Sequence, residues 1–529
     1  MKFQSSRLRD TCYKIDNLTL DQARQNGEIV RLGDSQLLIA TRNITNHYFD
    51  QTELNNLIKK SRKKKSFDTL EKIDKMLFIP DLVTIEFTDS RHYKSLIGRG
   101  GLQLNGKIYQ RLLSGAGMSR RSTVLFCNTE IIEPLREFLN CGRNPEYKKE
   151  PSKFSAYYAL ASSSTWQVSS PKFVVIPDCE IERYTTVDFL HESVDKNKDP
   201  VVSPENLLLK YNLFDGQGLI CPKKAQEWSD ELCMDYTPSA MIFRNAFAKG
   251  LLVTFDFHKF ATMQKLYKIT DIYGQDHNVE DIEVILSLSQ FKLWDAYENT
   301  ESYIQKCNDN NFSWGISRST PKYEKNHAFS TYQYLQNLNI TTQEQIAGLC
   351  KNTIEWFDKI LGDSWVYTIL FLLGELSENI VETPGWFDNL NNPLLQSLLL
   401  QPKLINDKKI QTKVQRLLAK KIKESYLGVL LLHGNYQMMI SDPYAQAEHA
   451  LGLEPKGLLK NEEHFSQYWN KNNETKVAAL RSPLTYRSEI NILNLQNNNI
   501  MQDWYKYQNS GIIFNIHGTD CLRMSGADL

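Results

Sequence analysis

The sequence lacks several features that would assign it quickly to a class of protein. Its 62 lysines and arginines balance 62 aspartates and glutamates, so it has none of the excess positive charge that is usual in a simple nucleic-acid coat protein. Its nine cysteines are odd in number and include no C-x-x-C pair, which argues against a zinc site or a disulfide framework and favours a reducing compartment. Walker A, Rossmann and H-E-x-x-H patterns are also missing.

Long hydrophobic runs are absent too. The first residues contain no apolar signal region, and the most apolar run, residues 366–373, is far shorter than the roughly 20 residues that a membrane-spanning helix needs. We therefore expect an intracellular protein without membrane contact. We expect residues 366–373 to form a buried helix.

The length and the changing periodicity of the chain predict an α+β protein of several domains. With 529 residues, of which 41% are hydrophobic, the chain can bury cores of ordinary size. Residues 1–75 look mixed, and helical towards their end. Short strand patterns dominate 76–169 and 170–300, where glycine turns between strands suggest a small barrel. Helical periodicity fills 301–425, and strands return in 426–529.

Individual segments make these predictions specific. Residues 102–109 read as a hairpin, because an Asn-Gly pair suits a two-residue turn. Residues 344–361 and 410–425 carry apolar side chains at helical spacing. Residues 429–432 and 436–440 read as strands on either side of a turn.

Two motifs in the first barrel region could carry chemistry. Asp215-Gly216-Gln217-Gly218 places two glycines where the backbone can turn tightly beside a partner strand. Pro238-Ser239-Ala240 is followed by Arg244 and by Lys249-Gly250. A lysine fixed on a barrel strand can neutralise a phosphate group at a reacting centre. Taken singly, an ordinary hairpin turn and a surface lysine account for the same residues.

Two further motifs lie in the C-terminal strand region. The first is Arg481-Ser482-Pro483-Leu484-Thr485-Tyr486-Arg487, and the second is Ser525-Gly526-Ala527-Asp528-Leu529. A carboxylate on a turn punctuated by glycine is one way to present a metal ligand. The alternative is that Asp528 is a single exposed acid at a frayed terminus.

In their order along residues 150–529, these motifs resemble those of the cellular RNA-dependent RNA polymerases of the RNA-silencing type. They also resemble related phage polymerases, and all of these share a two-barrel core with the multisubunit RNA polymerases. At two positions in particular the chain departs from the patterns of these polymerases. Tyr486 stands where their R-x-P-x-x-H-R segment has its histidine, and Gln290 stands where their R-x-S-M-x-K-F strand has its lysine. The resemblance implies two double-psi β-barrels, the second incomplete, joined by a helical connector behind an N-terminal mixed region.

The resemblance also implies nucleotidyl transfer with Mg²⁺ as cofactor. In that reaction a 3′-hydroxyl attacks the α-phosphate of a nucleoside triphosphate, and pyrophosphate leaves. Lys249 would be the active-site lysine, with Lys224 as a second candidate, and Asp528 would be both catalytic and the first magnesium ligand. The residues that would bind substrate are Arg244, Arg481 and Pro483.

The partners implied are a nucleic-acid template, the RNA product and nucleoside triphosphates. In the family's D-L-D-G-D pattern two more aspartates follow the position of Asp528. The resemblance therefore implies that the chain stops inside its catalytic motif and lacks polymerase activity alone, so that a C-terminal segment or a second chain would complete the site. An RNA template is favoured. The alternatives are a DNA-dependent RNA polymerase of a phage, acting in the host cytoplasm, and a non-catalytic nucleic-acid-binding module of the same fold.

Overall fold

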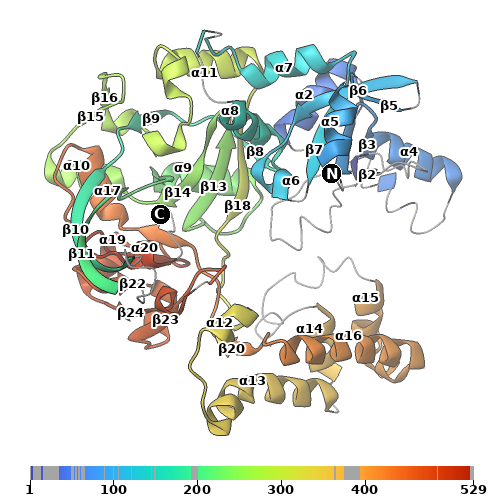
Figure 1. Cartoon of the computed structure of the whole chain (residues 1–529), viewed down its shortest axis with the longest axis vertical. Coiled ribbons are helices and arrows are strands. Elements are labelled where there is room, and N and C mark those ends of the chain that lie inside the picture. The colour runs from blue at the N-terminus through green and yellow to red at the C-terminus, as the bar shows by residue number, and fades with distance from the viewer. Residues whose placement is uncertain are drawn as a thin grey trace.

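Near the N-terminus, the computed structural model forms a five-stranded sheet in the order β2-β4-β7-β6-β5 (Figure 1). Leu104 of β5 pairs with Lys107 of β6, and Gly106 between them has a φ of 79°, so the predicted Asn-Gly hairpin is confirmed. The strands are β2 (Tyr13–Ile15), β4 (Leu82–Phe87), β5 (Leu102–Leu104), β6 (Lys107–Leu113) and β7 (Thr123–Asn128). The helices beside them are α2 (Gln36–Thr45), α4 (Phe67–Leu77), α5 (Ser90–Gly98), α6 (Ala116–Arg120), α7 (Ile132–Asn140) and α8 (Pro151–Tyr158).

The structure does not describe every residue of the chain. The described residues are 2–3, 13–15, 35–48, 50, 53, 56–57, 60, 66–87, 90–98, 100–104, 106–120, 122–144, 146–147, 151–191, 201–362, 365–373, 393–484 and 486–524.

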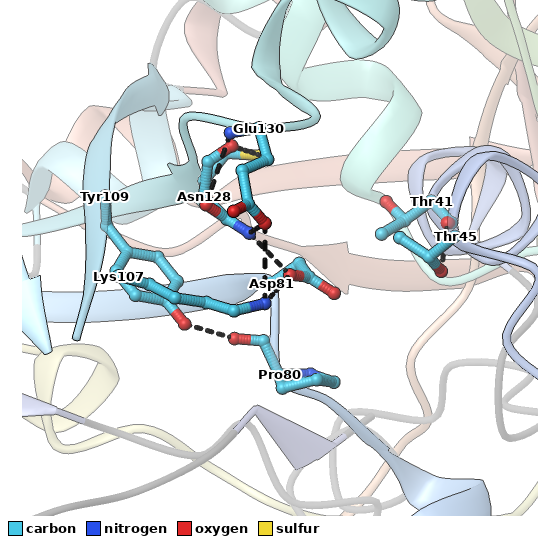
Figure 2. A network of polar contacts seen from close by, with 9 residues as sticks. Thr41, Thr45, Pro80, Asp81, Lys107, Tyr109, Asn128 and Glu130 are labelled. Atoms are coloured by element: carbon cyan, nitrogen blue, oxygen red, sulfur yellow. Dashed lines mark hydrogen bonds and ion pairs between the residues drawn. The ribbon is translucent and has the colours of Figure 1, made fainter. Parts of the chain in front are cut away.

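A network of charged and polar side chains ties the N-terminal sheet together (Figure 2). The amide of Asn128 donates to Asp81 at 2.9 Å and to Glu130 at 3.0 Å. The ammonium of Lys107 lies 3.3 Å from the carboxylate of Asp81 and 3.7 Å from that of Glu130. Because Asp81 is buried and both of these neighbours donate to it, its charge is compensated within the domain, which is the arrangement expected of a structural contact.

The centre of the molecule is a seven-stranded sheet in the order β8-β18-β13-β14-β12-β17-β9. The β12–β14 and β17–β9 pairs are parallel and the other pairs are antiparallel. Two of its strands, at residues 166–168 and 314–319, lie outside the 170–300 range predicted for the first barrel. The strands are β8 (Trp166–Val168), β9 (Phe173–Ile176), β12 (Gln217–Ile220), β13 (Ala240–Asn245), β14 (Ala248–Thr254), β17 (Val284–Ser287) and β18 (Trp314–Ser319).

A second five-stranded sheet, in the order β21-β25-β22-β24-β23, is formed by the C-terminal part of the chain. Phe255, just after β14, and Leu219 of the first sheet share one hydrophobic cluster with Ile440, Phe465 and Ile513 of the second, so the two sheets are held together by a common core. The strands are β21 (Met439–Ser441), β22 (Glu463–Phe465), β23 (Lys476–Ala479), β24 (Asn491–Leu495) and β25 (Ile512–Phe514). The helices are α17 (Pro443–Ala450), α18 (Gln467–Lys471), α19 (Asn499–Trp504) and α20 (Asp520–Arg523).

The helical connector forms a separate unit at the bottom right of Figure 1. The predicted helices at 344–361 and 410–425 are confirmed by α13 and α16, and the predicted buried helix at 366–373 by α14, whose Ile369, Leu370 and Phe371 are buried. No helix in the described part of the chain has the length and apolar character to cross a membrane. The helices of this unit are α12 (Tyr332–Gln336), α13 (Gln343–Leu361), α14 (Trp365–Leu373), α15 (Pro393–Leu400) and α16 (Lys408–Tyr426). Helix α11 (Thr300–Asp309) falls in the range 301–425 predicted for the connector, but it lies beside α7 at the top of Figure 1, and its Tyr303 and Cys307 pack in the core of the central sheet.

The strands on either side of the turn at 433–435 belong to different sheets. β20 (Leu431–His433) pairs with β19 (His327–Phe329), and the two strands lie at the two ends of the α12–α16 unit. Instead of pairing with β20, β21 joins the second sheet through β25. The local sequence pattern predicts both strands. The partner of β20 lies about a hundred residues away in the sequence and that of β21 about seventy, and periodicity does not reveal such pairings.

Candidate active site

Lys249 and Arg244 project from neighbouring strands at one edge of the seven-stranded sheet. They are cross-strand partners in the β13–β14 pair, so the sheet brings these two predicted site residues together. Lys249 is exposed and Arg244 is half-buried. A bridge between Ala248 and Phe291 brings Lys292, the residue after Phe291, to the same edge.

The charges around Lys249 make its ammonium unusual. Desolvation by the surrounding protein lowers the pKa of Lys249 below its usual value, the positive charges of Arg244 and Lys292 lower it further, and Asp215 acts in the opposite direction. Three cations at one sheet edge repel one another, and Asp215 offsets only part of this repulsion at Lys249. The cluster therefore favours the approach of an anion.

Gln290 fills the space behind this edge. Its amide nitrogen donates to the carbonyls of Gly216 at 3.1 Å and of Leu251 at 2.9 Å, and its amide oxygen accepts from the backbone N–H of Ser287 at 3.1 Å. These contacts need a neutral side chain that both donates and accepts, which lysine does not provide. Gln290 thus gives the D-G-x-G turn a structural support.

We expect Gly250→Ala to lower the free energy of unfolding by about 1–3 kcal/mol, because it overpacks this site. A Cβ atom at Gly250 would lie 2.2 Å from the Gln290 amide nitrogen and 2.6 Å from the Gly216 carbonyl oxygen. Gly348→Ala in α13 is the control, since nothing lies within 4 Å of its Cβ position and alanine favours the helix. Urea denaturation of both variants measures the difference, and equal stability of Gly250→Ala and the wild type would contradict the packing described here.

Gln217, the variable residue of the D-G-x-G motif, joins the two sheets. Its side-chain amide nitrogen donates to the Ser441 carbonyl at 3.0 Å and to the Gln446 amide oxygen at 2.9 Å. Its amide oxygen accepts from the Ser441 N–H at 2.9 Å, and its main-chain carbonyl accepts from the Gln446 amide at 2.8 Å. All three residues are buried, so the contact fixes the lysine-bearing sheet against the start of α17.

A cavity of about 260 Å³ opens at this junction. Asp215 of the D-G-x-G motif and Ser441 of β21 lie on its wall, together with residues just before the Ser525-Gly526-Ala527-Asp528-Leu529 motif. Asp215 and Leu522, which lie about 300 residues apart in the sequence, therefore line the same hollow. The lining residues are Lys210, Tyr211, Asn212, Leu213, Asp215, Ser441, Asn515, Ile516, Gly518, Cys521 and Leu522.

Lys224 lies elsewhere. It is buried on α9 (Pro222–Glu231), where its ammonium is 3.1 Å from Glu227, 3.6 Å from Glu283 and 3.2 Å from the Ser169 hydroxyl. Since β12 and β14 are parallel, Lys249 sits near the N-terminal end of its strand, whereas Lys224 follows the C-terminal end of β12. The catalytic role of Lys224 stays a prediction, and its buried ion pairs favour a structural one.

Arg481 and Pro483 occupy the loop after β23, at the edge of the second sheet. Both are exposed, and the Ser482–Pro483 peptide bond is cis. The next residue, Leu484, is buried, and its N–H donates to Gln333 of α12 at 3.2 Å. The loop is therefore anchored to the helical connector, on a different element from the Lys249 cluster, and its role in substrate binding stays a prediction.

Asp528 lies outside the described residues. Among those that are described, no group of three or more His, Cys, Asp or Glu side chains is arranged to hold a metal ion.

Sequence reasoning missed three residues that shape the site. Gln217 and Gln290 stand within motifs that were recognised, but their hydrogen bonds depend on distant partners. Arg183, on a strand far from any motif, contacts the backbone just before α20. For Gln217 the sequence offered a signal, because an amide side chain stands between the two glycines of a recognised motif. Nothing in the local sequence marks Arg183.

Comparison with known proteins gives three findings. A family model described as RNA dependent RNA polymerase matches residues 82–529. The DNA-directed RNA polymerase YonO of Bacillus phage SPbeta is 27% identical over 408 residues, which cover 74% of this chain and 44% of the relative, so the chain spans less than half of that protein's length. The structure of the RNA dependent RNA polymerase QDE-1 from Thielavia terrestris aligns with a TM-score of 0.48 and 14% identity, covering 81% of this chain and 44% of the other.

Proposed function

Because the chain belongs to the RNA-dependent RNA polymerase family, we propose that it carries out templated nucleotidyl transfer from nucleoside triphosphates as part of an RNA polymerase. The observation that supports this best is the pairing of Lys249 with Arg244 on adjacent strands. Asp215, which lines the cavity between the two sheets, is among the charges that act on Lys249. A cationic edge beside a hollow is what a triphosphate substrate requires.

In the proposed reaction the 3′-hydroxyl oxygen of the growing strand forms a bond to the α-phosphorus of the incoming nucleotide. The bond from that phosphorus to the bridging oxygen of the β-phosphate breaks, pyrophosphate leaves, and the hydroxyl proton passes to solvent. Lys249 would neutralise charge on the triphosphate or on the 3′ end, and Arg244 would bind the substrate beside it. Arg481 and Pro483 would bind the nucleotide from the second sheet.

We also propose that the seven-stranded sheet is the lysine-bearing double-psi β-barrel and that the second five-stranded sheet belongs to the aspartate-bearing one. The mixture of parallel and antiparallel pairs in the first, and the core that both share, support this assignment. Magnesium is the proposed cofactor, with Asp528 as its first ligand. When bound, it would supply positive charge to the reacting phosphates.

The template is the finer part of the proposal. The family's name favours RNA, and DNA is the second candidate because the phage relative is named a DNA-directed RNA polymerase. We expect the protein expressed from its complete gene to extend a primer with nucleoside triphosphates and Mg²⁺ on one template at least about 10-fold faster than on the other. Matched RNA and DNA templates of one sequence, in the same primer-extension assay, measure the ratio.

A non-catalytic nucleic-acid-binding module of the same fold is the other outcome of that assay. Binding of a labelled duplex without extension on either template would support that module and contradict the enzyme. Running the 529-residue chain beside the product of the complete gene tests separately whether these residues suffice.

A further inference from the structure

A long two-stranded hairpin connects β9 of the central sheet to the D-G-x-G motif. β10 (Glu180–His191) and β11 (Val201–Asn212) pair along their full lengths, and the hairpin lies against the elements of the second sheet on the left of Figure 1. Ile181 pairs with Tyr211 and Arg183 with Leu209, so the side chains of Arg183 and Tyr211 project from the same face. This is the less exposed face, since Arg183 is half-buried whereas its neighbours Glu182 and Tyr184 are exposed.

Arg183 meets a turn of the backbone at residues 515–518, between β25 and α20. Its guanidinium donates to the carbonyls of Ile516 at 2.5 Å and Gly518 at 3.2 Å, and also to that of His517. The hydroxyl of Tyr211 reaches the Gly518 carbonyl at 3.5 Å. Three successive carbonyls thus find their donors on the hairpin.

The N–H groups of the same turn are satisfied from the other side. The side-chain oxygen of Asn515 accepts from the N–H of His517 at 2.9 Å and of Gly518 at 2.7 Å, and its amide nitrogen donates to the Glu463 carbonyl of β22 at 3.0 Å. Residues 515–518 do not belong to a β-strand, so strand pairing does not fix their backbone. Their conformation depends on the side chain of Asn515 within the turn and on the side chain of Arg183 from the hairpin.

The root of the hairpin is fixed to both motif-bearing regions. Leu213 and Phe214, which follow β11, share a hydrophobic cluster with Ala445 of α17 and Ile516 of the turn. The next residues, Asp215 and Gly216, begin the D-G-x-G motif. The hairpin therefore has one rigid connection to the lysine-bearing sheet and another to the segment that leads to Asp528.

We infer that Arg183 is a positioning residue, which holds the 515–518 turn, and with it the segment leading to Asp528, in register with the lysine-bearing sheet. The effect of Arg183 on catalysis rests on the proposed function, whereas its contact with the turn is independent of that function. A guanidinium suits the task because it is planar and presents several N–H donors in a fixed fork, whereas a lysine ammonium is a compact head on a flexible stem.

Hydrogen–deuterium exchange of the full chain, without nucleic acid, tests the contact. In Arg183→Lys and Arg183→Ala we expect the amides of residues 516–524 to exchange about 10-fold faster or more, with the shared core unchanged. Tyr184→Ser is the matched control, because Tyr184 is the next residue of the same strand and is 79% exposed. Wild-type exchange rates at residues 516–524 in both Arg183 variants would overturn the inference.

Steady-state kinetics test the consequence for catalysis. We expect kcat for nucleotide incorporation to fall about 10- to 100-fold in Arg183→Lys while KM for the nucleotide changes little, because misplacing a catalytic segment affects the reacting geometry more than ground-state binding. Faster exchange with wild-type kcat would overturn the positioning role. These kinetics use the protein expressed from its complete gene. If its wild type extends no primer, the proposed function fails, and the exchange experiment still decides whether Arg183 holds the turn.

Discussion

Replacing Lys249 with methionine is expected to lower kcat for nucleotide incorporation by about 100- to 1000-fold, equivalent to about 3–4 kcal/mol of transition-state stabilisation. Methionine keeps the unbranched shape of the side chain but removes its charge. Because Lys249 is exposed, the free energy of unfolding should change by less than about 0.5 kcal/mol. Single-turnover primer extension together with urea denaturation separates the two effects.

Lys268→Met is the control for that experiment, since Lys268 is an exposed lysine on β15 (Lys268–Thr270) whose partner is Asp276 at 3.3 Å. The pH profile provides a second readout. Only the ammonium form neutralises phosphate, so wild-type activity should fall as the pH rises through the pKa of Lys249, which lies below the usual lysine value. Lys249→Arg should move this alkaline limit upwards, and an unchanged limit would argue against Lys249 as the titrating group.

The second large effect is expected on stability. Gln217→Met should lower the free energy of unfolding by about 3–5 kcal/mol, because it retains most of the volume but leaves the N–H and carbonyl of Ser441 and the Gln446 amide oxygen buried without their partner. Chemical denaturation followed by intrinsic fluorescence measures the loss.

Gln226→Met is the matched control, because Gln226 is an exposed amide on α9 whose side chain donates to Asp230 of the same helix and accepts from the hydroxyl of Thr237, neither of which belongs to the second sheet. Its stability should stay within about 0.5 kcal/mol of the wild type. Similar midpoints for the two variants would show that the contact between the sheets contributes little, and the rigid junction described for the cavity would then have to be abandoned.

Local structure was predictable where one physical signal dominates. The helix at 344–361 is confirmed nearly to the residue because its apolar spacing coincides with a capping box, in which Thr342 accepts from the Gln345 N–H at 3.3 Å. The Asn-Gly hairpin was equally clear. In the site, Arg244 and Lys249 were both named from one motif, and the structure places them side by side because that motif forms one hairpin of the sheet.

What the sequence did not reveal depends on contacts between distant residues. Lys224 was proposed as a catalytic residue from its motif alone. In the structure its ammonium lies near Glu283, a residue of another segment 59 positions away in the sequence. Arg183 and the 515–518 turn are separated by more than 330 residues, and no local pattern encodes their meeting. Periodicity reports which face of a strand is buried but not which strand it will join.

The β19–β20 pair has a consequence for how this protein can change over time. Paired antiparallel strands lie about 5 Å apart, so the chain leaves for the α12–α16 unit and returns from it at almost the same point. Apart from α12, which holds the loop after β23, the unit packs in clusters of its own, and the length of α13–α16 therefore does not enter the geometry of either sheet. Helices could be added, lost or exchanged there as a cassette, as domain insertions are at sites whose ends lie close together.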